Sequence, residues 1–457
     1  MKIFFRRAAC KTGMVLTAVF HQALPVSVDP FARVRENFAM ADMHPILILP
    51  FALLLGAMAL APVIAPRWWA DHYAKVALGL GAITAGIYLL VLRDTASLAQ
   101  AAHEYISFIA LVGSLFVVAG GIQIKIPGGA TPLTNVIFLL ISAGAANLLG
   151  TTGAAMLLIR PWIRMNQCRV TAHHIVFFIF IVANVGGSLT PIGDPPLFLG
   201  YLQGIPFGWV ARHCWPMWAT GTGLLLAIFY VVDQINFSRA LKTIRANETA
   251  HETWNCAGLP NLFFLAVILG AVFVNQPVFL REMLMLAAAA GSYLTTAKSV
   301  HAANEFNFHP VIEVAVLFAG IFATMIPALA WLDHHAAALL GQQPSPGIFY
   351  WGAGGLSAVL DNAPTYLGFL SALFGVTGAR EISELLDQKA AHVLAISIGA
   401  VFFGAATYIG NGPNFMVKAI AEQRGVRVPS FLEFIWKFSL PCLLPVLITV
   451  WLLFFRD

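Results

Sequence analysis

Long apolar runs without charged residues alternate with short polar segments along most of the chain. A helix needs about 20 apolar residues to cross the hydrocarbon core of a bilayer. By this measure the sequence predicts about ten membrane-crossing helices. They cover residues 45–65, 76–92, 106–124, 170–193 with an irregular continuation to 207, 213–232, 257–276, 283–297, 314–332, 390–409 and 438–455.

Two further apolar stretches, residues 126–159 and 334–379, do not fit a single crossing because polar residues interrupt them at 147–153 and 361–365. The arms on either side of each interruption are too short to cross separately. Non-helical backbone at bilayer depth is tolerated only when it is buried in protein or lines a cavity. The pattern therefore predicts two re-entrant hairpins.

The chain also repeats itself, which is common in transporters. Segments in the first half match segments in the second half in the same order, at offsets that grow slowly from 206 to 217 residues. The matching pairs are 103–106 with 309–312, 147–151 with 361–365, and 190–194 with 407–411. Each half then holds five crossings and one hairpin. Because five is an odd number, the second half enters the membrane in the opposite orientation, and we predict two inverted repeats.

The first repeat covers residues 45–235 and the second covers 259–457, with the polar segment 236–258 as the linker between them. Beyond residue 44, fourteen Lys and Arg residues fall on the side of the linker and six on the other. Cytoplasmic loops carry an excess of Lys and Arg. We therefore expect a cytoplasmic linker and a C-terminus on the outside.

Residues 1–44 allow two interpretations. Their basic start followed by an apolar stretch resembles a signal sequence. The alternative is that translation begins at Met40 or Met43. The sequence leaves both open.

Composition agrees with a membrane protein, because 59% of the residues are apolar and only 10% are charged. About 25% charged residues is usual in soluble proteins. The net charge of +5 is scattered between apolar runs, so the bilayer, and not a nucleic acid, is the expected partner. The five cysteines show no paired spacing, which argues against a disulfide framework or a thiolate metal site.

Insertion of a charged carboxylate at bilayer depth costs at least about 2.5–3.5 kcal/mol of free energy. An acidic residue predicted at this depth therefore calls for a structural or functional explanation. Asp194 follows a run in which Pro191, Pro195 and Pro196 remove backbone donors and Gly193 permits unusual dihedral angles. This run predicts a broken helix whose exposed carbonyls, with the Thr190 hydroxyl, suit a hard cation or a proton. The alternative is a simple kink that Asp194 caps.

The other three interruptions carry matching polar groups. The second broken helix holds Thr407, Gly410, Asn411, Gly412, Pro413 and Asn414, the second hairpin tip holds Asp361, Asn362 and Thr365, and the first tip holds Asn147, Thr151 and Thr152. An inverted repeat brings these four elements together near the midplane. We therefore expect these polar groups to bind the ion or substrate, with Asp194 and Asp361 as tentative Na⁺ ligands.

The sequence from 183 to 194, ending in Thr190-Pro191-Ile192-Gly193-Asp194, together with Asp361-Asn362-Ala363-Pro364, resembles the ion-transporter superfamily. Within it, residues 43–455 are similar to the D-type bacterial sodium/proton antiporters and to the related citrate transporter group. This resemblance implies a homodimer in the bacterial inner membrane, with a scaffold domain and a transport domain that moves like an elevator. The antiporters have an Asp-Asn pair in the first tip, where this chain has Asn147 and no acid.

The sequence leaves three candidate functions to compare. The first is sodium/proton antiport, in which Na⁺ and H⁺ alternate on the deep carboxylates without any other cofactor. The second is cation- or proton-coupled uptake of citrate or another carboxylate, held by tip amides, hydroxyls and helix N-termini. The third, an intramembrane enzyme, is disfavoured because the sequence lacks the paired acids and the nucleophile or metal motifs that such enzymes need.

Overall fold

The computed structural model describes residues 44–456 apart from 126–129, 240–254 and 275. Nearly all of the predicted N-terminal segment 1–44 and most of the predicted linker 236–258 lie outside the described residues. The described chain is mostly helical, which confirms the predicted all-α polytopic class at that level.

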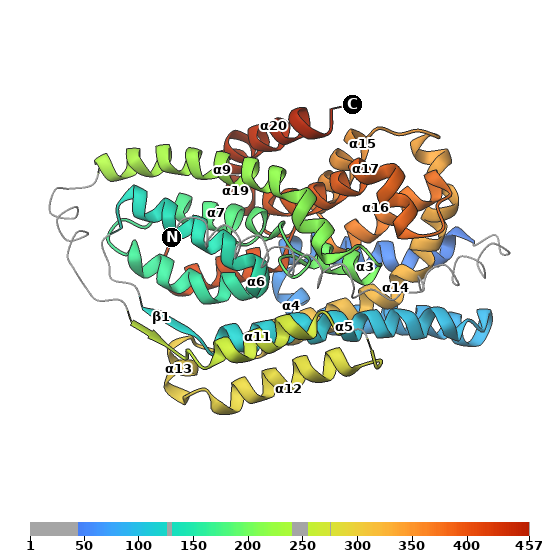
Figure 1. Cartoon of the computed structure of the whole chain (residues 1–457), viewed down its shortest axis with the longest axis horizontal. Coiled ribbons are helices and arrows are strands. Elements are labelled where there is room, and N and C mark those ends of the chain that lie inside the picture. Colours follow the sequence, from blue (N-terminus) through green and yellow to red (C-terminus); the bar gives the residue numbers. More distant parts are fainter. Residues whose placement is uncertain (1–43, 126–129, 240–254, 275, 457) are drawn as a thin grey trace, which may run out of the picture.

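The first half begins with helices that run back and forth along the molecule (Figure 1). In chain order it contains η1 (Pro45–Ile48), α3 (Leu49–Ile64), α4 (Pro66–Gly86), the π-helical η2 (Ile87–Leu92), α5 (Thr95–Gly120), β1 (Gln123–Lys125), α6 (Pro132–Met165), α7 (Ala172–Ile181), η3 (Val185–Gly187), α8 (Pro195–Leu202) and α9 (Phe207–Arg239).

The second half contains a similar mixture of long and short helices. It consists of β2 (Asn255–Ala257), α11 (Asn261–Ala271), α12 (Leu280–Thr295), α13 (Lys298–Ala303), α14 (His309–Leu340), α15 (Pro346–Ser357), α16 (Asn362–Thr377), α17 (Ile382–Phe403), η4 (Gly404–Ala406), α18 (Gly412–Gln423), α19 (Phe431–Phe434), the π-helical η5 (Ile435–Leu443) and α20 (Leu444–Phe454).

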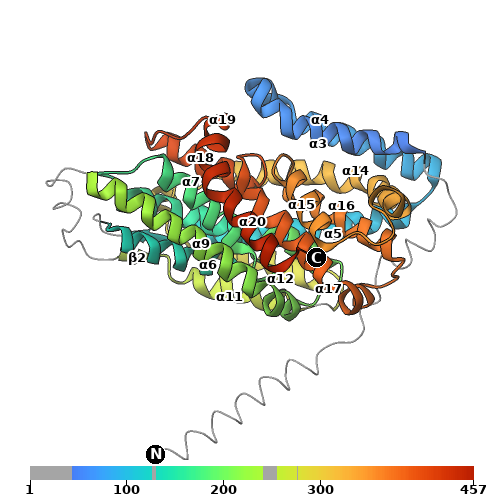
Figure 2. The same cartoon turned by 90° about the horizontal axis from the view of Figure 1, so that it is seen from above.

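The helices form two groups that pack along α5 and α14 (Figures 1 and 2). In one group α3 packs on α4, α4 on α14, and α11 and α12 on α5. In the other, α6, α7 and α9 pack together, as do α15, α16 and α17. Each group draws helices from both sides of the predicted linker.

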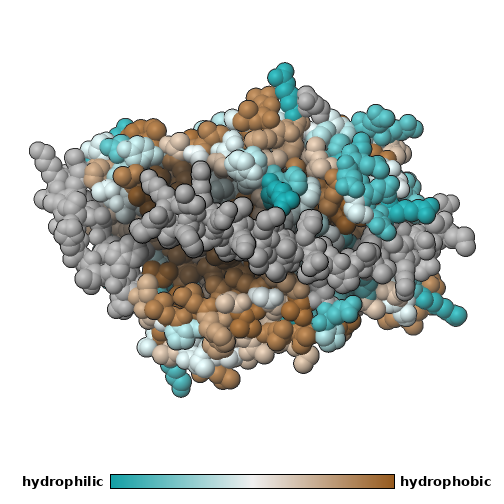
Figure 3. All heavy atoms as spheres, viewed as in Figure 1, coloured by the Kyte–Doolittle hydropathy of each residue, from teal (hydrophilic) through white to brown (hydrophobic). Residues whose placement is uncertain are grey.

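Eight helices in the described residues are long and apolar enough to cross a membrane. They are Pro45–Pro62, Pro66–Leu92, Thr95–Gly120, Pro132–Met165, Phe207–Arg239, His309–Leu340, Ile382–Ala406 and Phe431–Phe454. Figure 3 shows the matching surface, with apolar side chains over much of the visible described face.

Seven of these helices correspond to predicted crossings, whereas three predicted crossings form helices shorter than 18 residues. The predicted crossings at 170–193, 257–276 and 283–297 become α7, α11 and α12. The helical backbone of α7 ends because Asn184 adopts a non-helical conformation (φ −143°, ψ −88°). For α7 and α11 hydropathy alone overestimated the helix length, because apolar residues continue past the helix ends, whereas α12 has 16 residues, close to the 15 predicted.

Both stretches predicted as hairpins have other helix boundaries than expected. The helix α6 continues to Met165 instead of ending at 159, and it leaves helical geometry at Gly150 (φ 71°, ψ 155°), inside the predicted tip. The stretch predicted as the second hairpin begins at 334, but α14 continues to Leu340 because residues 334–340 include no glycine or proline before Gly341 (φ 86°). The helices α15 and α16 follow, and residues 358–361 separate them.

A two-stranded antiparallel ribbon, which the sequence did not predict, pairs β1 with β2. Gln123 lies opposite Ala257 and Lys125 lies opposite Asn255. The ribbon joins the chain just after α5 to the chain just before α11.

The contact between α4 and α14 generates the first prediction. A Cβ atom on Gly320 would lie 2.6 Å from the carbonyl oxygen of Ala77, so Gly320→Ala forces these two helices apart. Overpacking of this kind costs about 1–3 kcal/mol. We expect Gly320→Ala to lower the free energy of unfolding in detergent by that amount. Gly79→Ala in α4 is the control, because a Cβ there meets nothing within 4 Å; equal destabilisation of both variants would contradict this packing.

Candidate functional site

The two predicted helix breaks are present and have the same build. Between α7 and α8, the turn η3 leads to Asp194, whose backbone is extended (φ −144°, ψ 147°) and directly precedes α8. Between α17 and α18, the turn η4 leads to Asn411, which is also extended (φ −155°, ψ 137°) and directly precedes α18. Asp194 and Asn411 therefore occupy equivalent positions.

Close backbone contacts explain why both breaks contain glycine. A Cβ atom on Gly193 would overlap the carbonyl oxygen of Gly187, and a Cβ on Gly410 would lie 2.6 Å from the carbonyl oxygen of Gly404. Each break therefore folds back on its own 3-10 turn, which no larger residue permits. Pro195 is the first residue of α8 and Pro413 the second residue of α18, and proline is common in the first helical turn.

Asp194 lies at the centre of the site and is 1% exposed. Its Oδ1 accepts hydrogen bonds from Thr151 Oγ1 (2.6 Å) and Asn411 Nδ2 (2.9 Å), and its Oδ2 accepts one from Asn362 Nδ2 (2.7 Å). The three donors come from the α6 break, the second helix break and the start of α16. The structure thus brings residues from all four predicted elements to one carboxylate.

The alternative that Asp194 is only a helix cap does not describe this geometry, because its side chain makes no capping hydrogen bond to α8. Asp361 does cap its own helix, and its Oδ1 accepts from the Ala363 amide at 3.0 Å. Asp361 is half-buried, and the Thr365 hydroxyl donates to its backbone carbonyl at 2.9 Å.

The first tip is tied to the first helix break through Asn147. Its side-chain amide donates to the carbonyl of Gly186 (2.7 Å), and its Oδ1 accepts from the Leu189 amide (2.9 Å). The Thr190 hydroxyl donates to the carbonyl of Asn147 at 2.7 Å. Asn147 and Thr190 therefore hold the backbone of the site in place, and no hydrogen bond joins either of them to Asp194 in the described contacts.

The second half repeats the last of these contacts. The Thr407 hydroxyl donates to the carbonyl of Ala358, the residue after α15, at 2.7 Å, as Thr190 does to the carbonyl of Asn147 in α6. Thr407 also accepts from the backbone amides of Ile409 and Gly410, which shapes its own turn.

The sequence did not single out Asn184, which is fully buried and links the two helix breaks. Its Nδ2 donates to Asn414 Oδ1 (2.8 Å), and its Oδ1 accepts from Asn411 Nδ2 (3.2 Å). Asn414 Nδ2 in turn donates to the carbonyls of Gly404 and Thr407, both at 2.8 Å. Asn184 therefore orients the amide that Asn411 presents to Asp194. Its place in the segment 183–194, which resembles the ion-transporter superfamily, was the only sequence signal for it.

A small cavity of about 20 Å³ adjoins Asp194. Thr151, Thr152 and Gly193 line it, together with apolar residues of α5 such as Leu115. Asn362 Oδ1, which belongs to the amide that donates to Asp194, is buried and has no hydrogen-bond partner. The site therefore contains a buried carboxylate, an unpaired amide oxygen and room for a particle the size of one water molecule.

The remaining predicted backbone positions lie in the two breaks. Pro191, Gly193, Pro196, Gly410 and Pro413 are buried, Pro195 is half-buried and Gly412 is exposed.

The protein also contains a second buried polar cluster, which the sequence did not predict. The guanidinium of Arg169 donates to both carboxylate oxygens of Asp233 in α9, and Asn135 Nδ2 also donates to Asp233 (2.8 Å). The Nε2 atoms of His173 and His174 lie 3.2 Å from the same carboxylate. Arg169 and Asp233 flank predicted crossings, where charged residues are expected, and nothing in the sequence indicates that they pair.

The two imidazoles and the Asp233 carboxylate could together hold a metal ion, since their ligand atoms lie within 4.8 Å of one another. Arg169 already occupies the carboxylate, and its positive charge opposes a bound cation. We therefore treat this cluster as an ion pair that fastens α9 to the segment before α7.

A polytopic helical protein whose broken helices meet at a buried carboxylate has the organisation of a secondary transporter. The comparisons agree with this class. A family model described as "Putative citrate transport" matches residues 40–455, and the chain belongs to this family.

Curated relatives are distant. A "46 kDa membrane protein" of Mycobacterium leprae is 24% identical over 327 residues, which cover 66% of this chain and 73% of that protein. An uncharacterized transporter of Mycobacterium tuberculosis is 24% identical over 323 residues, covering 66% of this chain and 72% of that protein. The chain is thus a membrane transporter of the citrate transport family.

The Arg169–Asp233 pair generates the second prediction. Removal of one partner from a buried ion pair leaves an uncompensated charge and costs about 3–5 kcal/mol. We expect Asp233→Asn to lower the free energy of unfolding by this amount, measured by chemical denaturation in detergent. Glu433→Gln, which breaks the exposed pair with Lys437 (2.6 Å), should leave stability nearly unchanged. An Asp233→Asn variant as stable as the parent protein would contradict the assigned role.

Proposed function

We propose that this transporter is a sodium/proton antiporter in which Na⁺ and H⁺ compete for Asp194. The observation that carries the proposal is the arrangement around this carboxylate. It is buried, three neutral side chains donate to it, and the nearby Asn362 Oδ1 has no donor.

Two oxygens of this kind suit a hard cation, which prefers carboxylate and amide oxygen ligands. Burial favours the protonated carboxyl group, whereas a bound cation favours the ionised one. A single group can therefore exchange one ion for the other. Asp361 lies at the start of the same helix as Asn362 and serves in the proposal as a second acidic group.

The size of the site favours a small ion over an organic anion. The cavity beside Asp194 has about 20 Å³, which is close to the minimum for one water molecule. Citrate has thirteen non-hydrogen atoms and three carboxylates, and it does not fit a space of this size.

We further propose that the two halves are inverted repeats and that α6 and the α15–α16 pair are re-entrant hairpins. The equivalent bonds from Thr190 to Asn147 and from Thr407 to Ala358 support the repeat, as do the matching positions of Asp194 and Asn411. The distribution of Lys and Arg supports a cytoplasmic linker and an outer C-terminus. The resemblance to the antiporters supports a homodimer in a bacterial inner membrane.

A second candidate is cation-coupled transport of citrate or a similar carboxylate, and the family description favours it. Helices α8, α16 and α18 all begin beside the site, and helix N-termini attract anions. In this version Asp194 binds the coupling cation while the helix N-termini hold the substrate.

The third prediction separates the two candidates. Purified protein in liposomes, with internal pH recorded, should show proton movement when Na⁺ or Li⁺ is added outside, without citrate. Proton movement that requires citrate would select the second candidate instead. Accumulation of radiolabelled citrate under an imposed ion gradient tests the second candidate independently.

The fourth prediction concerns the carboxylate itself. Asp194→Asn keeps the shape of the side chain but removes its charge, so Na⁺-driven proton movement should fall to the level of empty liposomes. Asp361→Asn should reduce the rate of Na⁺-driven proton movement without abolishing it. Asp71→Asn, an exposed acid in α4, is the control and should transport normally. If Asp194→Asn and Asp361→Asn both retained Na⁺-driven exchange in everted vesicles, the antiport mechanism would be wrong.

A further inference from the structure

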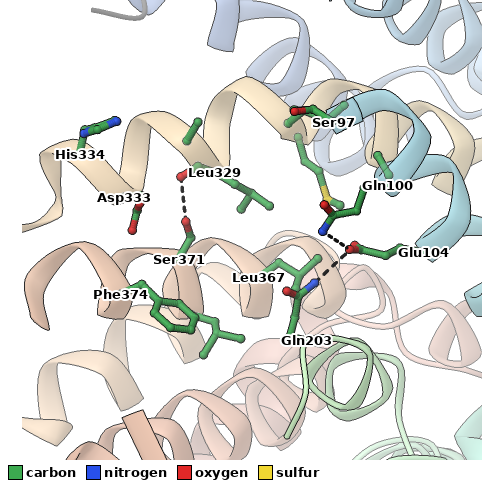
Figure 4. A pocket seen from close by; sticks show the side chains of 15 residues that line it. Ser97, Gln100, Glu104, Gln203, Leu329, Asp333, His334, Leu367, Ser371 and Phe374 are labelled. Atoms are coloured by element: carbon green, nitrogen blue, oxygen red, sulfur yellow. Dashed lines mark hydrogen bonds between the residues drawn. The ribbon is translucent and has the colours of Figure 1, made fainter. Parts of the chain in front are cut away.

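A second, larger cavity of about 80 Å³ lies between α5, α14 and α16 (Figure 4). One wall comes from α5 and α14, which pack with the first group of helices, and the other comes from α16 of the second group. Most of its lining is apolar, with Met325, Leu329 and Leu370 among the residues. It therefore lies on the boundary between the two groups.

The polar part of the lining holds two acids beside neutral groups and the exposed His334. Glu104 and Asp333 lie toward opposite ends of the cavity, with Ser371 between them (Figure 4). Glu104 is 5% exposed and accepts hydrogen bonds from Gln100 (3.1 Å) and Gln203 (3.4 Å), both neutral amides. The fifteen described residues of the lining include two acids and no lysine or arginine. Such a lining favours cations over anions.

Three elements connect this cavity with the one beside Asp194. On α5, Glu104 lines the larger cavity and Leu111 lines the smaller. The helix α8 begins directly after Asp194 and ends just before Gln203, which lines the larger cavity. On α16, Asn362 bonds to Asp194, and Leu367 lines the larger cavity about 7–8 Å further along the helix at 1.5 Å per residue. The two cavities therefore follow one another along the same helices.

We propose that the larger cavity is a cation-selective vestibule, in which Glu104 and Asp333 attract a monovalent cation on its way to Asp194. Its volume is four times that of the cavity beside Asp194, which leaves room for more than one water molecule and suits an ion that keeps part of its hydration shell. The final step to Asp194 rests on the proposed function, whereas the charge selectivity of the cavity does not.

Selectivity can be measured without transport. In a variant whose five native cysteines are replaced by alanine, Ser371→Cys places a thiol between the two acids. The rates of its modification by 2-aminoethyl methanethiosulfonate (cationic) and 2-sulfonatoethyl methanethiosulfonate (anionic) are compared, each relative to a free thiol. The cationic reagent should be favoured at least about ten-fold, and Glu104→Gln should reduce this preference about ten-fold by removing one nearby charge.

Two further variants complete the test. Asp333→Asn at the other end of the cavity should also reduce the preference, and it guards against misfolding of the Glu104→Gln protein. Glu313→Gln is the matched control, because Glu313 lies on α14 about 30 Å from Asp333 and does not line the cavity. Glu313→Gln should leave the preference for the cationic reagent unchanged. The vestibule is excluded if neither reagent reacts, if the preference equals that of a free thiol, or if neither acid influences it.

Transport then tests the link to Asp194. In proteoliposomes, Glu104→Gln should raise the Na⁺ concentration for half-maximal exchange about ten-fold while the maximal rate is retained, in contrast to the loss in Asp194→Asn. Charge-selective labelling in a protein that moves neither Na⁺ nor citrate would uphold the vestibule and refute the proposed function. Normal Na⁺ affinity in Glu104→Gln would remove Glu104 from the route of the ion.

Discussion

The buried carboxylate of Asp194 is the constraint on which the arrangement of the broken helices depends. A charged group without partners is very costly in a low-dielectric interior, so its hydrogen-bond donors must be supplied by the protein. They come from Thr151, Asn362 and Asn411, which are separated by up to 260 residues in the chain. An α-helix cannot deliver three such side chains to one point from its own turns. The chain has to be interrupted in several places, and the interruptions have to be packed against one another.

The two helix breaks differ at the point where they meet. Asp194 and Asn411 occupy equivalent backbone positions, yet one accepts hydrogen bonds and the other donates. Two carboxylates at this separation would repel each other, whereas an amide opposite a carboxylate is attractive whenever the acid is ionised. The neutral residue in the second break is therefore not a lost acid but the partner of the one that remains. Asn184 strengthens this view, because its buried side chain fixes which end of the Asn411 amide faces Asp194.

Much of this arrangement could be predicted from the sequence, because proline, glycine and isolated polar residues are local signals. They located both helix breaks, both tips and the donors Thr151, Asn362 and Asn411. Helix lengths were less predictable. Helix α5 begins at Thr95, well before residue 106, because Asp94 caps a polar first turn that hydropathy assigns to a loop. The sequence also could not predict the pairing of Arg169 with Asp233. A charged residue can be identified as buried and paired only when its partner, here distant in the chain, is known.

The β1–β2 ribbon has a mechanical consequence. It pairs the residues that follow α5 with the residues that precede α11, so the chain departs toward α6–α9 and returns from them at one place. The chain therefore joins α6–α9 to α5 and α11 through the paired strands β1 and β2, which act as a single stem instead of two separate connections. A body held by one stem can tilt about it without stretching either strand. In a protein whose site is built partly on α6 and α8, this stem is the natural pivot.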